Sequence, residues 1–149
     1  MKQGSFELEI HIEREPKDVL ALVSNYNRHP AIHPLILSVK QIDTPPGMIG
    51  RYLITDQLQM GPFRFKIEYR ADIVRVTDQE VYTEAYQSPG TYVYNLTRIT
   101  PQAGGTRLQE TITLKAPNLL FGYAFNQARN AHGEMLARIK QYMENETPA

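Results

Sequence analysis

The chain has 149 residues, of which 42% are hydrophobic and 21% charged, the composition of an ordinary globular domain. Its sixteen basic and sixteen acidic residues cancel, so no overall charge favours binding to nucleic acid or to an anionic membrane. The absence of cysteine excludes disulfides, thiol catalysis and thiolate metal sites.

The sequence predicts neither a signal peptide nor a membrane span. No apolar run opens the chain, and no stretch approaches the roughly 20 apolar residues that cross a bilayer. We therefore expect one cytoplasmic domain over residues 1–149, without stable insertion into a membrane.

A strand and two short helices are the first elements expected. Phe6–Glu13 alternates between apolar and polar residues, as a half-buried strand does. Pro16 then opens a short helix, because proline suits a first helical turn. The segment Asn27–Pro34 holds two prolines that disfavour helical geometry in the residues before them, so only one further helical turn is expected there.

Six strands with short connections follow. Their expected ranges are Leu35–Ile42, Arg51–Leu58, Phe63–Val76, Glu80–Gln87, Thr91–Thr100 and Thr106–Lys115. Short connections imply antiparallel hairpins, because a parallel crossover needs about a dozen residues or more.

The last element expected is a long helix over Pro117–Met143, with Asn118 as its N-cap. Its apolar stripe has helical spacing and consists of Phe121, Ala124, Phe125, Ala128, Ala131, Met135, Ile139 and Tyr142. The first half of the stripe contains three alanines and the second half is bulky. This difference predicts a cavity under the first half, unless the alanines serve only close helix–sheet packing.

These elements predict an α+β fold. A curved, seven-stranded antiparallel sheet packs around the long C-terminal helix, and two short helices follow the first strand. A twisted sheet around a single helix cannot close everywhere, and the remaining opening is a natural ligand pocket.

Short stretches and their order resemble a known superfamily. The stretches are Phe6–Ile10 with Pro16–Val19, Asn27–Pro34, Gly104–Leu108, and the terminal helix with His132 and Leu136. They resemble the START-like helix-grip (SRPBCC) superfamily and its polyketide cyclase/dehydrase and lipid-transport branch. The resemblance implies a cavity that binds lipids, sterols, aromatic polyketides or similar molecules. It implies no catalytic residue, because the family has no universal catalytic motif and the fold hosts both carriers and catalysts.

Glu110 is the first candidate for a polar group in that cavity. It shares strand parity with the apolar residues Leu108 and Ile112. A carboxylate on a buried face needs a partner, or its pKa rises. Arg98 on the preceding strand is the expected partner. The alternative to a site is a partly exposed ion pair near the sheet edge.

Further candidates for the ligand-binding wall come from the strands and the terminal helix. Tyrosine offers apolar area and one hydroxyl, although it is also a good strand residue. His132, one step off the apolar stripe, belongs either to the pocket margin or to a solvated flank. The candidates besides Arg98 and Glu110 are Tyr69, Tyr92, Tyr94, Phe121, Ala124, Phe125, Ala128 and His132.

We expect neither a metal nor a cofactor. His29 and His33 lie four residues apart, but Pro30 stands where a zinc-binding H-E-x-x-H motif has glutamate, so both are expected to be structural or surface residues. Dinucleotide, phosphate-loop and serine-nucleophile motifs are absent. Basic residues between positions 64 and 70 are interrupted by an acidic residue, so no nucleic-acid partner is predicted.

The leading functional hypothesis is binding or transport of a small hydrophobic, aromatic or lipid-like molecule. The rival hypothesis is a polyketide cyclase or dehydratase in which Glu110, a tyrosine or His132 supplies acid–base catalysis. A third hypothesis is a domain that binds a protein partner. The sequence leaves the oligomeric state open.

Overall fold

The structure, a computed structural model, describes residues 1–145. Its elements in chain order are β1 (Lys2–Ile12), α1 (Pro16–Val23), the 3₁₀ helix η1 (Tyr26–Ala31), β2 (Ile36–Ile42), β3 (Gly50–Met60), β4 (Phe63–Val76), β5 (Glu80–Gln87), β6 (Thr91–Gln102), β7 (Gly105–Ala116) and α2 (Asn118–Asn145). The number, type and order of these elements confirm the predicted fold.

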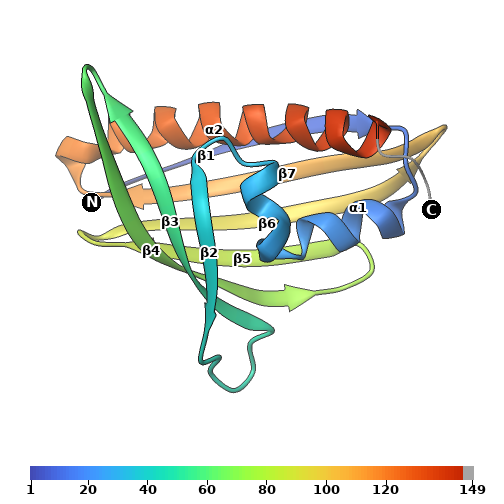
Figure 1. Cartoon of the computed structure of the whole chain (residues 1–149), viewed down its shortest axis with the longest axis horizontal. Coiled ribbons are helices and arrows are strands. Elements are labelled where there is room, and N and C mark those ends of the chain that lie inside the picture. Colours follow the sequence, from blue (N-terminus) through green and yellow to red (C-terminus); the bar gives the residue numbers. More distant parts are fainter. Residues whose placement is uncertain (146–149) are drawn as a thin grey trace.

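The strands form one antiparallel sheet in the order β1-β7-β6-β5-β4-β3-β2. Strands β2 to β7 are therefore neighbours in chain order, and β1 closes the edge beside β7. β1 begins at Lys2, before the expected Phe6, because its first residues pair with β7 as far as Ala116. The sheet is strongly twisted, and in the view of Figure 1 β2 lies nearly perpendicular to β7.

α2 runs along one face of the sheet beside β1 and β7 (Figure 1). The carbonyl of Pro117 accepts the amides of Leu120 and Phe121 at 2.9 and 3.0 Å. Pro117 therefore occupies the cap position, and Asn118 is the first helical residue. The expected capping role of Asn118 was wrong, because the backbone already turns into the helix one residue earlier.

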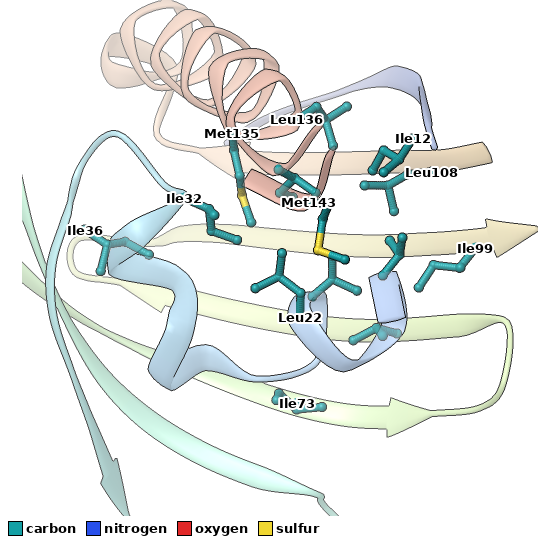
Figure 2. Packing of buried hydrophobic residues seen from close by; sticks show 14 of the residues in the cluster. Ile12, Leu22, Ile32, Ile36, Ile73, Ile99, Leu108, Met135, Leu136 and Met143 are labelled. Carbon is teal, nitrogen blue, oxygen red and sulfur yellow. The ribbon is translucent and has the colours of Figure 1, made fainter. Parts of the chain in front are cut away.

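The main hydrophobic core fills one end of the space between the sheet and the helices (Figure 2). It joins the second half of α2 to α1, η1 and the inner face of the sheet. Ile12, Leu22, Leu108, Met135 and Met143 are among its buried members. The bulky half of the α2 stripe thus packs in the core, as its composition predicts.

The first half of α2 is seated on β1 by two phenylalanines. The rings of Phe121 and Phe125 lie 5.3 Å apart, and Phe125 also meets Phe6 edge-on at 5.3 Å. Gly4 permits this contact, because a Cβ at that position would stand 2.8 Å from the Phe121 ring. α2 therefore lies close to the β1 edge of the sheet.

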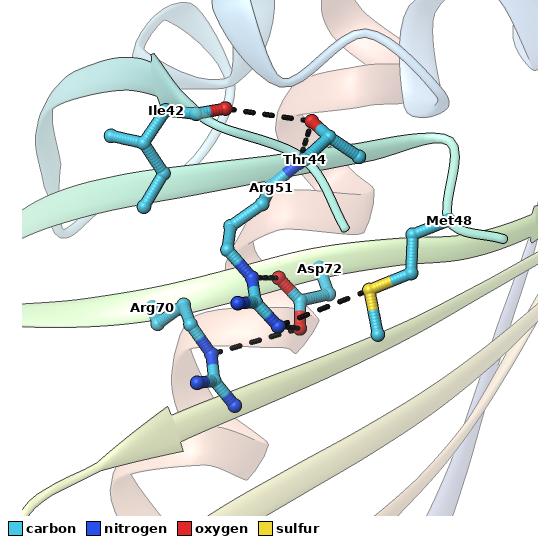
Figure 3. Close-up of polar contacts among 6 residues, drawn as sticks. All are labelled: Ile42, Thr44, Met48, Arg51, Arg70 and Asp72. Carbon is cyan, nitrogen blue, oxygen red and sulfur yellow. Dashed lines mark hydrogen bonds and ion pairs between the residues drawn. The ribbon is translucent and has the colours of Figure 1, made fainter. Parts of the chain in front are cut away.

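On the outer face of the sheet, two arginines neutralise the buried carboxylate of Asp72. Arg51 donates to both oxygens of Asp72, at 2.8 and 3.0 Å, and Arg70 lies 3.6 Å from the same carboxylate (Figure 3). The hydroxyl of Thr44 accepts the amide of Arg51 at 3.1 Å. This network fixes the β2–β3 connection against β4.

Two leucines of α2 test the packing described above. Leu136 is 4% exposed and Leu119 is 100% exposed. Leu136→Ala should lower the free energy of unfolding by about 2–5 kcal/mol, because it leaves a void in the core. Leu119→Ala, the matched control, should change it by less than about 0.5 kcal/mol. Urea unfolding followed by circular dichroism measures both, and equal losses would contradict this packing.

Candidate functional site

A cavity of about 360 Å³ lies between α2 and the inner face of the sheet. α2 contributes Ala124, Ala128, Ala131 and His132 to its wall, and inward-facing residues of β3 to β7 supply most of the rest. The predicted cavity beside the alanines is therefore present. It is continuous with the core at its inner end, where Met135 and Ile139 belong to both.

The cavity opens at the end where α2 begins. Among its lining residues, Leu120, Tyr123 and Phe65 are the large hydrophobic ones with the greatest exposure, at 41%, 38% and 36%. Pro89, in the β5–β6 turn, completes this mouth. In Figure 1 the β3–β4 turn, the β5–β6 turn and the start of α2 gather at the same end of the molecule. The large exposed side chains at the entrance are thus apolar, and the polar residues Gln87 and Thr91 line the cavity beside Pro89.

Glu110 lies on the cavity wall and is 3% exposed. The amide of Asn95 donates to it at 2.5 Å, and Nδ1 of His132 lies 3.3 Å from its carboxylate. Burial raises the pKa of Glu110, but the charge of His132 and the hydrogen bonds from His132 and Asn95 outweigh burial and bring the pKa below its ordinary value. The carboxylate therefore remains ionised at neutral pH.

Asp56 is a second carboxyl group in the cavity that the sequence analysis missed. It is 6% exposed, and the hydroxyl of Tyr69 donates to it at 3.3 Å. Burial raises the pKa of Asp56 to about 6, against the opposing effects of Tyr69 and His132. Tyr69 stays protonated, because burial raises its own pKa well above 10. The signal was available, since Asp56 shares strand parity with the apolar residues Ile54 and Leu58.

His29 and His33 line the same cavity and bond to the backbone. Nε2 of His29 lies 3.0 Å from the carbonyl of Val23, and Nδ1 of His33 accepts the amide of Leu35 at 3.1 Å. Burial lowers the pKa of His29 to about 4 and that of His33 to about 3. Both rings are therefore neutral at pH 7. The His33 ring meets the ring of His132 edge-on, 5.8 Å away.

The structure separates the ten predicted site residues into two groups. Five line the cavity, namely Tyr69, Glu110, Ala124, Ala128 and His132. The other five are absent from its lining: Tyr92, Tyr94, Arg98, Phe121 and Phe125.

The placement of the second group corrects the sequence analysis. Arg98 is opposite Gln109 and lies 3.4 Å from Glu80 on the outer face, so its expected pairing with Glu110 was wrong. Tyr92 and Tyr94 share that outer face, where their rings stack with centroids 6.4 Å apart. The two phenylalanines pack against β1, away from the cavity.

The comparisons with known proteins agree with this architecture. The sequence profile of the family described as polyketide cyclase/dehydrase and lipid transport matches residues 3–144. The chain belongs to this family. The profile therefore spans every element of the fold, including β1 and nearly all of α2. The comparison with curated proteins finds no match.

Solved structures with the same fold have dissimilar sequences. The di-domain ARO/CYC protein StfQ from the steffimycin biosynthetic pathway is 13% identical, with a TM-score of 0.77 over 95% of this chain and 51% of StfQ. This member of the family thus spans about half the length of StfQ. Ara h 8.0201 is 14% identical, with a TM-score of 0.69 over 97% of this chain and 100% of its own.

A third similar structure is TTHA0849 from Thermus thermophilus. It is 13% identical and has a TM-score of 0.71 over 94% of this chain and 97% of its own. At such low identities these likenesses concern the fold alone. They support the helix-grip architecture predicted for the family member described here.

Two further properties concern residues 1–145. No helix in this range is long and apolar enough to cross a membrane. Within the same range, no group of three or more histidine, aspartate or glutamate side chains is arranged to hold a metal ion.

The buried histidines predict a sensitivity to acid. Below pH 6.5 the unfolded chain binds protons that folded His29 resists until about pH 4, so the free energy of unfolding falls as the pH falls through this window. The contribution is about 1.4 kcal/mol per pH unit. His29→Gln should therefore reduce the slope of stability against pH by that amount between pH 6 and 4.5.

Urea unfolding at half-unit intervals of pH measures both slopes. Above pH 7.5 the unfolding free energies of the variant and the wild-type protein should run parallel, because His29 is neutral in both states there. Identical slopes below pH 6 would mean that His29 titrates normally in the folded chain.

Proposed function

We propose that this protein binds a small hydrophobic or aromatic molecule in the cavity between the sheet and α2. The cavity itself is the observation that carries the proposal. Its volume of about 360 Å³ lies in the range of ligand pockets, which are about 300–1,000 Å³. Membership of the polyketide cyclase/dehydrase and lipid transport family supports the same function.

The composition of the wall also favours a ligand of this kind. Most of its residues are apolar, and polar groups from different elements also line it, among them the pairs Asp56–Tyr69 and Glu110–His132, as in sites that orient a mainly apolar molecule. The apolar mouth at Leu120, Tyr123 and Phe65 offers such a molecule a continuous path from the surface.

A matched pair of alanines on α2 tests the proposal. Ala128 lines the cavity, whereas Ala137 is exposed on the same helix. The wild-type protein should bind N-phenyl-1-naphthylamine, a neutral dye whose fluorescence rises in apolar surroundings. Ala128→Phe should weaken this binding by about tenfold or more, because the new ring occupies the cavity and tenfold corresponds to only about 1.4 kcal/mol.

Ala137→Phe should leave the dye affinity unchanged. Thermal unfolding of both variants verifies that they fold. Equal dye binding by the folded Ala128→Phe variant, or no binding by the wild-type protein, would contradict the proposed site.

The paired Glu110 and His132 support a second candidate, an acid–base enzyme that uses the same cavity. When Nδ1–H of His132 donates to Glu110, the lone pair of Nε2 is left to accept a proton from a bound substrate. Removal of a proton from a carbon beside a carbonyl would give an enolate and an imidazolium. Exchange of the imidazolium proton with solvent, followed by delivery of the solvent-derived proton or deuteron to the enolate carbon, would complete the hydrogen exchange. This chemistry requires no cofactor.

Exchange of the α-hydrogens of 2-tetralone in D₂O, followed by NMR, tests the enzyme hypothesis. The wild-type protein should accelerate exchange by about 100-fold or more over buffer if His132 is a general base. His132→Gln should remove the acceleration. His11→Gln, a control on the outer face of the sheet, should retain it. Absence of acceleration together with binding of the dye would leave the carrier function.

A further inference from the structure

We infer that the ligand is an uncharged molecule whose hydroxyl group enters the cavity first and donates a hydrogen bond to the carboxyl groups there. Molecules with a carboxylate or phosphate head group are excluded. The inference rests on the proposed function, since it names the class of ligand for the same cavity.

The charges of the cavity exclude an anion. Glu110 and Asp56 are both buried in its wall. Within the described part of the chain, neither lysine nor arginine lines it. Arg138 acts electrostatically on His33, but its side chain is 43% exposed and pairs with Glu134 at 2.7 Å. A bound anion would meet two carboxyl groups with only His132 as a possible counter-ion, and like charges in contact are strongly unfavourable.

Asp72, on the outer face of the sheet, provides a comparison, because it is a buried carboxylate whose charge is neutralised. Asp72 has two arginines against it, one of them bidentate. Glu110 has an amide and an imidazole, and Asp56 accepts from a phenol. The two carboxyl groups of the cavity are therefore held without a guanidinium group, and each keeps the capacity to accept another hydrogen bond.

The donors beside these carboxyl groups are already engaged. The Tyr69 hydroxyl donates to Asp56, and the Asn95 amide and His132 Nδ1 serve Glu110. An ionised carboxylate accepts about four hydrogen bonds, so acceptor capacity exceeds the donors that the protein supplies. A ligand that donates complements this surplus. A hydroxyl also accepts, which suits neutral His33, whose proton resides on Nε2 because Nδ1 accepts from Leu35.

The position of this cluster fixes the direction of entry. His132 lies nine residues beyond Tyr123 on α2, about 14 Å deeper along the helix axis. The large exposed side chains at the mouth are apolar, whereas His132 and its partner Glu110 lie deeper, so the hydroxyl leads and the apolar body of the ligand remains toward Leu120 and Tyr123.

Three probes of nearly equal size test the inference at pH 7.5: 2-naphthol, 2-methoxynaphthalene and 2-naphthoate. The first carries a donor, the second has none, and the third is an anion. Isothermal titration calorimetry should give an affinity for 2-naphthol about tenfold or more above that for each of the others, the value of one hydrogen bond to a charged acceptor.

Two carboxyl variants connect the preference to the cavity. Glu110→Gln should reduce the 2-naphthol to 2-naphthoate affinity ratio by about tenfold, because a like charge is removed from the wall. Glu7→Gln, on the outer face of the adjacent β1, should leave the ratio unchanged. Asp56→Asn provides the same test as Glu110→Gln if the latter variant fails to fold.

The outcomes distinguish the two proposals. Equal affinities for 2-naphthol and 2-methoxynaphthalene, or tightest binding of 2-naphthoate, would overturn the hydroxyl inference while leaving a ligand-binding cavity. Failure of both neutral naphthalenes and of N-phenyl-1-naphthylamine to bind would overturn the proposed function and the inference with it.

Discussion

The inner face of the sheet is wider than the one long helix that covers it, and this mismatch decides where the core and the cavity lie. α2 packs along the β1 and β7 side, seated by Phe121 and Phe125 against Gly4. At one end α1 and η1 supply the missing apolar volume, so the core closes there. Toward the other end α2 presents Ala124, Ala128 and Ala131 to the cavity, and about 360 Å³ remains open.

Strand parity made the fold and part of the site predictable from sequence. An alternating strand exposes one face to water, so an out-of-place carboxylate such as Glu110 can be recognised from the alternation alone. The partner of Glu110 was predicted wrongly, because the prediction depended on a single step of strand register. Thr97, opposite Glu110, faces inward, whereas the next residue, Arg98, faces outward. His132 reaches Glu110 from α2, and a contact between layers leaves no periodic trace in the sequence. Asn95 is a diagonal neighbour of Glu110 on the adjacent β6. Asp56 carried the same parity signal and was missed.

Three buried carboxyl groups show how local surroundings, rather than burial alone, set the charge of a protein interior. Asp72 is neutralised by guanidinium groups, Glu110 is kept ionised by an imidazole and an amide, and Asp56 accepts a hydrogen bond from a phenol. Accordingly, the pKa of Glu110 falls while that of Asp56 rises to about 6. The cavity therefore holds two carboxyl groups of unequal acidity, one of them in contact with His132 and the other within reach of its electrostatic effect, an arrangement suited to hydrogen-bonding or proton transfer.

The backbone hydrogen bonds of the cavity wall are satisfied within the sheet, independently of the side chains that face the ligand. Most lining positions can therefore exchange one apolar or small polar residue for another without disturbing the pairing that defines the fold. The shape and polarity of the cavity can therefore change by single substitutions while the sheet is retained. Such a scaffold is highly evolvable, which accounts for architectures this similar at sequence identities near 13%.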